Sequence, residues 1–210
     1  MTMWIKICGL TTPEAVTAAL DAGADAIGFV FAKSVRQVSA DVALRLAAPA
    51  RGRALCVAVT RHPSQPDIDE ILSVFRPDAL QTDSNDLALL QLPTQLELLP
   101  VLRGAASEVG DGRGDDERGG ALALPRRVLF EGLTSGAGVP CDWTAARRVA
   151  HRTELVLAGG LNPANVAAAI AAVQPFGVDV STGVEARPGV KSPAEIMNFV
   201  SAAREPKRRL

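Results

Sequence analysis

Eight short apolar runs alternate with alanine-rich stretches along nearly the whole of this 210-residue chain. Each run has the length of a buried strand, and a helix-start signal such as Ser192-Pro193 follows several of them. This alternation predicts repeated βα units with a parallel sheet. The runs occupy residues 4–8, 26–31, 54–59, 78–82, 98–103, 127–131, 154–159 and 177–181. We therefore expect an α/β fold with one domain, residues 1–210, in the form of a (βα)8 TIM barrel.

The fifth helical position breaks this pattern. Residues 104–124 are crowded with Gly, Asp and Glu, and no apolar period survives in them. The same repeat resumes after this segment without a change in composition, so the segment does not read as a linker between two domains. We expect a flexible loop in place of the fifth helix.

Composition and charge argue against several classes of protein. The net charge of −1 does not suit a nucleic-acid-binding surface. No apolar run approaches the ~20 residues of a membrane span, and the N-terminus lacks the layout of a signal peptide. Three widely spaced cysteines suit free thiols in a reducing compartment, and two histidines argue against a histidine-rich metal site. We expect a cytoplasmic protein with no nucleic-acid partner, no membrane partner and no metal.

Two segments near the end of the chain, residues 157–162 and 178–185, each run an apolar strand into small residues. Because glycine has no Cβ, it lets backbone N–H groups approach an anion, and a helix that begins just beyond directs its positive dipole end there. In eight-stranded βα barrels, phosphate sites follow the seventh and eighth strands. Two ordinary tight turns remain the alternative to a site for a phosphorylated small molecule. The candidate phosphate contacts are Gly159, Gly160, Ser181, Thr182 and Gly183.

Side-chain alternation sorts the residues of the first strand into two environments. Ile5 and Ile7 point to one side and Lys6 and Cys8 to the other. The apolar pair should pack against the helices, which directs Lys6 and Cys8 into the barrel and places Cys8 at the carboxyl-end rim. The same parity turns Asp179 of the last strand inward. Lys6 and Asp179 are therefore expected to form an internal ion pair, with either a structural role or a role in substrate positioning.

Glu131 ends the sixth apolar run and directly precedes Gly132. An acid that follows three apolar residues is poor core material and is typical of chemistry at the barrel rim. We expect apolar neighbours such as Leu129 to favour the protonated form of this carboxyl.

Four segments resemble the phosphoribosylanthranilate isomerase family. They read KICGLT at 6–11, GFVFAKSVRQVS at 28–39, LAGGLNPANV at 157–166 and GVDVSTGVEARPGVKSP at 177–193. The resemblance extends from the first strand to the last helix and implies a βα barrel that needs no cofactor. It also implies an activity in tryptophan biosynthesis, the Amadori rearrangement of N-(5-phosphoribosyl)anthranilate to 1-(2-carboxyphenylamino)-1-deoxyribulose 5-phosphate.

The resemblance assigns roles to individual residues. Ring opening needs an acid that protonates the furanose oxygen, and a base must then remove the proton at C2. The family's base falls on Cys8 and its acid on Glu131. Arg36 takes the role of pairing with the anthranilate carboxylate, and Asp179 that of a substrate contact. For Cys8 to act as a base, Lys6 or the phosphate site is expected to lower the pKa of its thiol below the ordinary ~8.5.

The chain departs from the family pattern at three places. The family usually has aspartate at the acid position, where this chain has Glu131, which is longer by one methylene group. After the fourth strand, the family's Gln-aliphatic-His-Gly turn reads Gln81-Thr82-Asp83-Ser84, so Asp83 is the candidate substrate contact in place of the histidine. After the sixth strand, Gly-Gly-Thr-Gly is replaced by Ser135-Gly136-Ala137-Gly138.

Two other functions are compatible with parts of the pattern. Another phosphosugar barrel enzyme would not need Cys8 as an essential base and would use an anion clamp other than Arg36. A non-catalytic phosphate-binding protein would bind ligand without turnover, but the joint presence of Cys8, Arg36, Glu131 and Asp179 argues against it. The sequence leaves open whether the protein is a monomer or a homodimer.

Overall fold

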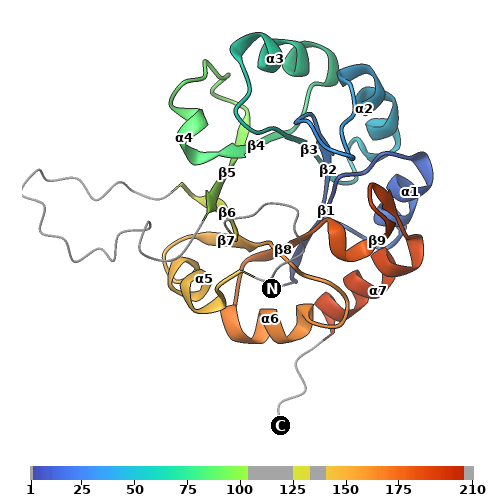
Figure 1. Ribbon diagram of the computed structural model, residues 1–210, viewed down its shortest axis with the longest axis vertical. Coiled ribbons are helices and arrows are strands. Elements are labelled where there is room, and N and C mark those ends of the chain that lie inside the picture. The colour runs from blue at the N-terminus through green and yellow to red at the C-terminus, as the bar shows by residue number, and fades with distance from the viewer. Residues whose placement is uncertain (1, 104–124, 133–140, 206–210) are drawn as a thin grey trace, which may run out of the picture.

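Eight parallel strands close into a barrel in the computed structural model, which describes residues 2–103, 125–132 and 141–205 (Figure 1). Each strand pairs with the next, and the first pairs with the last. All eight predicted strands are confirmed, with ends that differ from the prediction by at most two residues. The strands are β1 (Trp4–Cys8), β2 (Ala26–Val30), β3 (Leu55–Val59), β4 (Ala79–Asp83), β5 (Glu97–Arg103), β6 (Arg127–Glu131), β7 (Glu154–Leu157) and β8 (Gly177–Val180).

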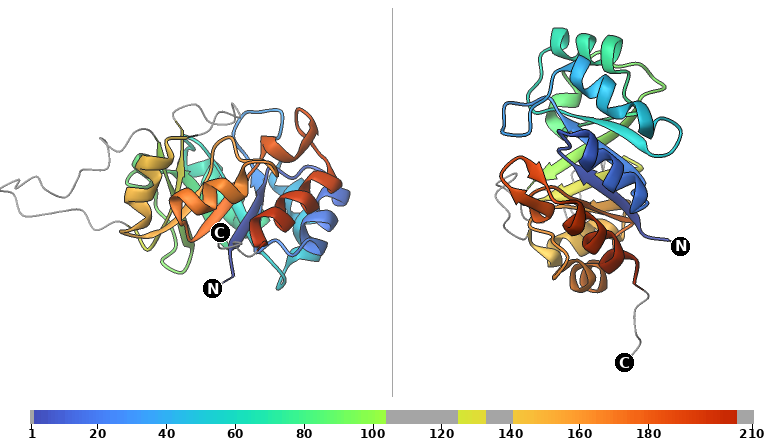
Figure 2. Two further views of the ribbon diagram at one scale, coloured as in Figure 1. Left: turned by 90° about the horizontal axis from the view of Figure 1, so that it is seen from below. Right: turned by 90° about the vertical axis from the view of Figure 1, so that its right-hand side faces the viewer.

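Helices surround the strands, as the (βα)8 pattern predicts (Figure 1). They are α1 (Pro13–Asp21), α2 (Ala40–Ala47), α3 (Gln65–Glu70), α4 (Ser84–Leu87), α5 (Trp143–Ala150), α6 (Val166–Val173) and α7 (Pro193–Arg204). A π-helical turn at Ile71–Phe75 extends α3, and a short hairpin, β9 (Glu185–Arg187) and β10 (Val190–Lys191), follows β8. Figure 2 shows α1, in blue, beside α7, in red, where the two ends of the barrel sequence meet. Residues 104–124, where we expect a loop instead of a helix, and residues 135–138 lie outside the described residues.

Capping side chains fix the ends of the loops that follow several strands. Thr12, Ser39 and Ser192 each precede a helix, and each side chain accepts a hydrogen bond from the backbone N–H three residues later. Proline stands in the first turn of α1 and α7, where its missing N–H costs no hydrogen bond. These loops lie at the carboxyl ends of the strands, where a barrel carries its chemistry.

The main core lies between the barrel and its helices. Ile5 and Ile7 of β1 and Val178 and Val180 of β8 belong to this core, which confirms the predicted outward direction of the apolar residues. Lys6, with the opposite parity, is fully buried inside the barrel. No helix in the described part of the chain is both long and apolar enough to cross a membrane.

Candidate active site

A cavity of about 220 Å³ opens at the carboxyl ends of the strands. Most of the predicted site residues line it: Cys8, Arg36, Glu131, Gly159, Gly160, Asp179, Ser181 and Thr182. Lys6, Asp83 and Gly183 do not line the cavity, but each lies against a residue that does. Closure of the barrel therefore brings residues from the first and last strands around a single cavity.

The turn after β7 has the backbone shape that its glycines predict. Gly159 and Gly160 adopt φ angles of 87° and 65°, a region that side chains rarely occupy. The expected helix just beyond them is displaced, because α6 begins only at Val166. The Asn162 side chain accepts hydrogen bonds from two following backbone N–H groups and closes a separate turn first. Phosphate binding by the amides of Gly159 and Gly160 stays a prediction.

The turn after β8 packs closely against the turn after β7. A Cβ on Gly183 would collide with the backbone carbonyl of Leu161, so glycine is needed there for the contact between the two loops. Ser181 and Thr182 line the cavity directly before it. Direct contact of Gly183 with a phosphate stays a prediction.

The predicted ion pair inside the barrel is confirmed. Lys6 Nζ lies 2.7 Å from Asp179 Oδ1, on strands β1 and β8, which pair at these residues. Burial opposes the charge on Lys6, but the carboxylate of Asp179, helped by Cys8, raises the pKa of Lys6 above its ordinary value. No part of the Lys6 side chain is exposed, and its ammonium group lies against Asp179 and Cys8.

Cys8 lies at the carboxyl end of β1 and lines the cavity, as predicted, but only 6% of it is exposed. Gly28 makes room for this arrangement, because a Cβ there would lie 3.0 Å from Cys8 Sγ and 3.1 Å from Lys6 Nζ. The expected lowering effect of Lys6 on the pKa of the Cys8 thiol is present but is outweighed. Burial raises the pKa of the Cys8 thiol, and although Lys6 opposes this effect, the negative charge of Asp179 reinforces it.

Arg36 is held in place by an acid that the sequence analysis missed. Its Nε and Nη2 donate hydrogen bonds to the two carboxylate oxygens of Glu185 at 2.6 and 2.9 Å. This two-point contact is the strongest geometry open to a guanidinium and a carboxylate. Arg36 is thus a fixed residue of the cavity wall and not a solvated loop arginine.

Lys191 completes this group and was also missed. Its Nζ donates to Glu185 Oε1 at 2.9 Å and to the backbone carbonyl and hydroxyl of Ser181. Burial works against the charge on Glu185, but hydrogen bonds from Arg36 and Lys191 lower its pKa to about 2. Burial lowers the pKa of Lys191 despite the opposing effect of Glu185. Glu185 and Lys191 lie on the β9–β10 hairpin, so their contacts with Arg36 and Ser181, which line the cavity, depend on a fold-back that strand periodicity does not reveal.

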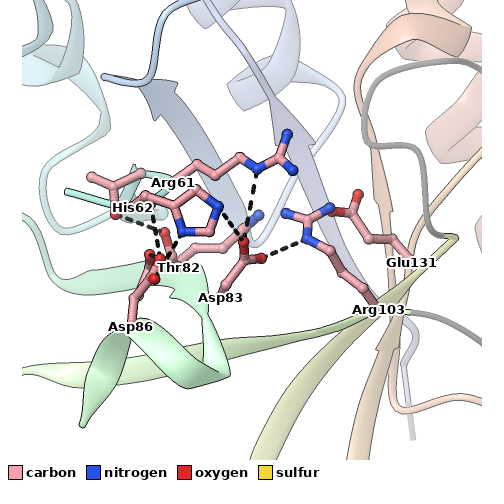
Figure 3. Close-up of polar contacts among 9 residues, drawn as sticks. Arg61, His62, Thr82, Asp83, Asp86, Arg103 and Glu131 are labelled. Atoms are coloured by element: carbon pink, nitrogen blue, oxygen red, sulfur yellow. Dashed lines mark hydrogen bonds and ion pairs between the residues drawn. The ribbon is translucent and has the colours of Figure 1, made fainter. Parts of the chain in front are cut away.

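Glu131 is paired with a cation, which the expectation of apolar neighbours such as Leu129 did not include. Figure 3 shows the guanidinium of Arg103 between two carboxylates, those of Glu131 and Asp83. Arg103 Nη1 donates to Glu131 Oε1, and Arg103 Nε donates to Asp83 Oδ1 at 2.6 Å. Leu129 does belong to an apolar cluster inside the barrel, but one pleat further from the rim than Glu131. Arg103 and Glu131 end neighbouring strands in register, which brings them together.

A second carboxylate, Asp86, supports the far side of Asp83. Asp86 accepts hydrogen bonds from the His62 backbone and from Thr82 Oγ1, and His62 Nδ1 lies 3.0 Å from its Oδ1 (Figure 3). His62 Nε2 lies 3.9 Å from Asp83 Oδ2. His62, Asp83 and Asp86 are close enough together to hold a cation. Asp83 Oδ1 and both oxygens of Asp86 take part in contacts with protein groups of this cluster.

Gln81 of β4 adds an acceptor that has no hydrogen-bond partner in the described part of the chain. Among the described residues, Gln81 Oε1 and Trp143 Nε1 are the buried side-chain polar atoms without a hydrogen-bond partner. Gln81 lines the cavity. A buried amide oxygen of this kind is costly unless a ligand or water satisfies it, which makes Gln81 a candidate substrate contact.

Comparison with known proteins identifies the family. The sequence model of the family described as N-(5'-phosphoribosyl)anthranilate (PRA) isomerase matches residues 5–202. The chain belongs to the phosphoribosylanthranilate isomerase family. Family members from Rhizobium rhizogenes and Brucella canis are 40% and 39% identical to it, over 96% of this chain and 94% of each relative.

Solved structures of the family share the fold. Phosphoribosylanthranilate isomerase from Thermotoga maritima has a TM-score of 0.78 at 30% identity, covering 96% of this chain and 98% of that chain. A family structure in complex with reduced 1-(o-carboxyphenylamino)-1-deoxyribulose 5-phosphate has a TM-score of 0.75 at 29% identity and the same coverage. Asp83 and Glu131, where the resemblance implies other residues in the family, meet on the single guanidinium of Arg103.

Proposed function

We propose that this protein is a phosphoribosylanthranilate isomerase of tryptophan biosynthesis. It rearranges N-(5-phosphoribosyl)anthranilate to 1-(2-carboxyphenylamino)-1-deoxyribulose 5-phosphate by general acid–base catalysis, without a cofactor. The observation that carries the proposal is the joint lining of one cavity by a thiol, Cys8, and a carboxyl group, Glu131. Two opposed proton-transfer groups are what this isomerisation requires.

The first step opens the ribose ring. Glu131 gives a proton to the furanose oxygen as the bond between that oxygen and C1 breaks, and the nitrogen lone pair forms an iminium with C1. The Cys8 thiolate then removes the proton from C2, and the electron pair of that bond forms the C1–C2 double bond and neutralises the nitrogen. Tautomerisation of this enol moves a proton to C1 and leaves the ketone at C2, so substrate and product have the same atoms.

Other residues hold the substrate during these steps. Gly159, Gly160, Ser181 and Thr182 bind the phosphate through backbone amides and hydroxyl groups, supported by the glycine geometry at positive φ. Arg36, fixed by Glu185, pairs with the anthranilate carboxylate.

Lys6 and Asp179 support the reacting end of the cavity. Asp179 takes the role of a substrate contact that the resemblance implies, and its position on the cavity wall supports this role. Lys6 is a positioning residue, because its ammonium is buried against Asp179 and cannot reach the cavity. The carboxylate of Asp83 likewise acts through Arg103, rather than through a direct contact with the substrate.

We further propose a cytoplasmic enzyme with a small phosphorylated substrate and no nucleic-acid or membrane partner. The Thermotoga maritima relative is described as dimeric and has also been obtained as monomers. Both states stay open for this chain, and light scattering of the purified protein distinguishes them.

Incubation of the purified protein with N-(5-phosphoribosyl)anthranilate tests the proposal, with the change in anthranilate fluorescence as the readout. We expect saturable turnover, with competitive inhibition by inorganic phosphate. Binding of the substrate without turnover would instead support a non-catalytic phosphate-binding protein. Turnover of a different phosphosugar alone would support another barrel enzyme.

A further inference from the structure

Three charged residues from consecutive strands form a row at the rim of the barrel. Asp83 ends β4, Arg103 ends β5 and Glu131 ends β6. Their side chains are largely buried, with 19% of Arg103 and 13% of each carboxylate side chain exposed. Arg103 and Glu131 line the cavity, whereas Asp83 does not. Arg103 is therefore the residue that connects Asp83 to the cavity (Figure 3).

Asp83 is held firmly enough to orient Arg103. Its Oδ1 accepts the short hydrogen bond from Arg103 Nε, and its Oδ2 faces two more basic groups. Arg61 Nε lies 3.8 Å and His62 Nε2 lies 3.9 Å from that oxygen. His62 is itself fixed by Asp86. A guanidinium that is held through Nε has its plane fixed, so its remaining donors point in one direction.

We propose that Arg103 is a positioning residue of the isomerase reaction, oriented by Asp83 so that it holds the Glu131 carboxyl at the cavity. This inference rests on the proposed function, in which Glu131 is the acid. Glutamate has one more rotatable bond than aspartate, and a misplacement of about 1 Å in a catalytic group can reduce turnover by on the order of 10²-fold. A charge-assisted contact from Arg103 restricts that freedom.

Asp83 also balances the positive charge of Arg103 when Glu131 gains or loses its proton. With Glu131 ionised, one guanidinium serves two carboxylates. When Glu131 carries the proton that it donates, Arg103 still has Asp83 as its counter-ion, so no buried cation is left unpaired. The other ionisable groups facing this row in the described chain are Arg61 and His62 from the β3–α3 loop, Asp86 of α4 and Cys141 before α5.

The kinetics of Arg103 variants separate positioning from binding. We expect Arg103→Met to lower kcat by on the order of 10²-fold while KM changes only a few-fold, because the lost contact acts on the acid and not on the substrate. Arg103→Lys should recover part of this loss, since it keeps the charge but not the planar fork. Asp83→Asn should lower kcat to a smaller extent, again with little change in KM. Arg126→Met, at an exposed arginine outside the cavity, is the matched control and should leave both constants unchanged.

A double variant gives the decisive comparison. In a Glu131→Gln background, Arg103→Met should have little further effect, because the group that Arg103 positions no longer transfers a proton. Multiplicative losses in the double variant, or a kcat for Arg103→Met within about three-fold of wild type, would overturn the proposal while leaving the isomerase function intact. Absence of turnover by the wild-type protein would overturn the function itself.

Circular dichroism shows whether Arg103→Met folds. If it does not fold, Arg103→Lys and Asp83→Asn test the proposal instead, and an unchanged kcat in both variants contradicts it.

Discussion

Lys6 and Asp179 face each other across the seam where β1 and β8 close the barrel, with Nζ 2.7 Å from Oδ1. Loss of one partner leaves the other as an uncompensated buried charge. We therefore expect Lys6→Met or Asp179→Asn to lower the free energy of unfolding by about 3–5 kcal/mol in urea denaturation followed by circular dichroism. The double variant should lose clearly less than the sum of the two single losses. Additive losses would show that the two groups do not stabilise each other.

Substrate affinity should depend on Arg36. A pair between its guanidinium and a substrate carboxylate forms in both the ground state and the transition state, so Arg36→Met should raise KM strongly and change kcat less. Steady-state kinetics with N-(5-phosphoribosyl)anthranilate measures both constants. Arg45→Met, at an exposed arginine of α2, is the control and should behave as wild type. An unchanged KM in Arg36→Met would mean that the carboxylate binds elsewhere.

The pH profile of the wild-type enzyme should be flat near neutrality. The productive form has a proton on Glu131 and a thiolate at Cys8, and its share is constant wherever this pair holds one proton in total. We therefore expect kcat/KM to be level around pH 7. Because burial raises the pKa of Cys8, the fall on the alkaline side should begin above about 8.5.

Removal of the acid should change the shape of that profile. In Glu131→Gln only the thiolate titrates, so the residual kcat/KM should rise about tenfold per pH unit until Cys8 is ionised. We also expect a loss in kcat on the order of 10²-fold or more at pH 7. A variant profile as flat as that of wild type would assign the acid to another group.

Glu131→Asp is a more selective change at the same position. Aspartate is the usual family residue, but here it would withdraw the carboxyl group by one methylene from Arg103, which is fixed by Asp83. We expect a drop in kcat that is smaller than in Glu131→Gln, with KM nearly unchanged. Wild-type turnover in Glu131→Asp would show that the Arg103 contact does not set the position of the acid.

The sequence predicts the barrel and part of the site for a simple geometric reason. Strand residues alternate with a period of two, and a closed barrel places its first and last strands side by side. Parity therefore identifies Lys6 and Asp179 as inward-facing neighbours, and it places Cys8 at the rim. The structure confirms each of these predictions.

Residues whose role depends on long-range contacts were missed. In the sequence, nothing distinguishes Arg103 from other polar residues at the ends of strands. Its partners Asp83 and Glu131 lie 20 and 28 residues away in the chain. Glu185 and Lys191 lie within residues 177–193, one of the segments that resemble the family. However, only the β9–β10 hairpin turns them toward Arg36 and Ser181. The effect of Lys6 on the pKa of Cys8 can be expected from the sequence, whereas the depth of burial that outweighs it cannot.

The role of Cys8 as the base is the central claim, and the turnover of Cys8→Ser tests it most directly. A serine hydroxyl is far too weak a base near neutral pH, so kcat should fall almost to zero while KM stays within a few-fold of wild type. Cys56→Ser, at a buried thiol that does not line the cavity, is the matched control and should keep most of the activity. Turnover of N-(5-phosphoribosyl)anthranilate by Cys8→Ser at more than about a tenth of the wild-type rate would contradict the assignment.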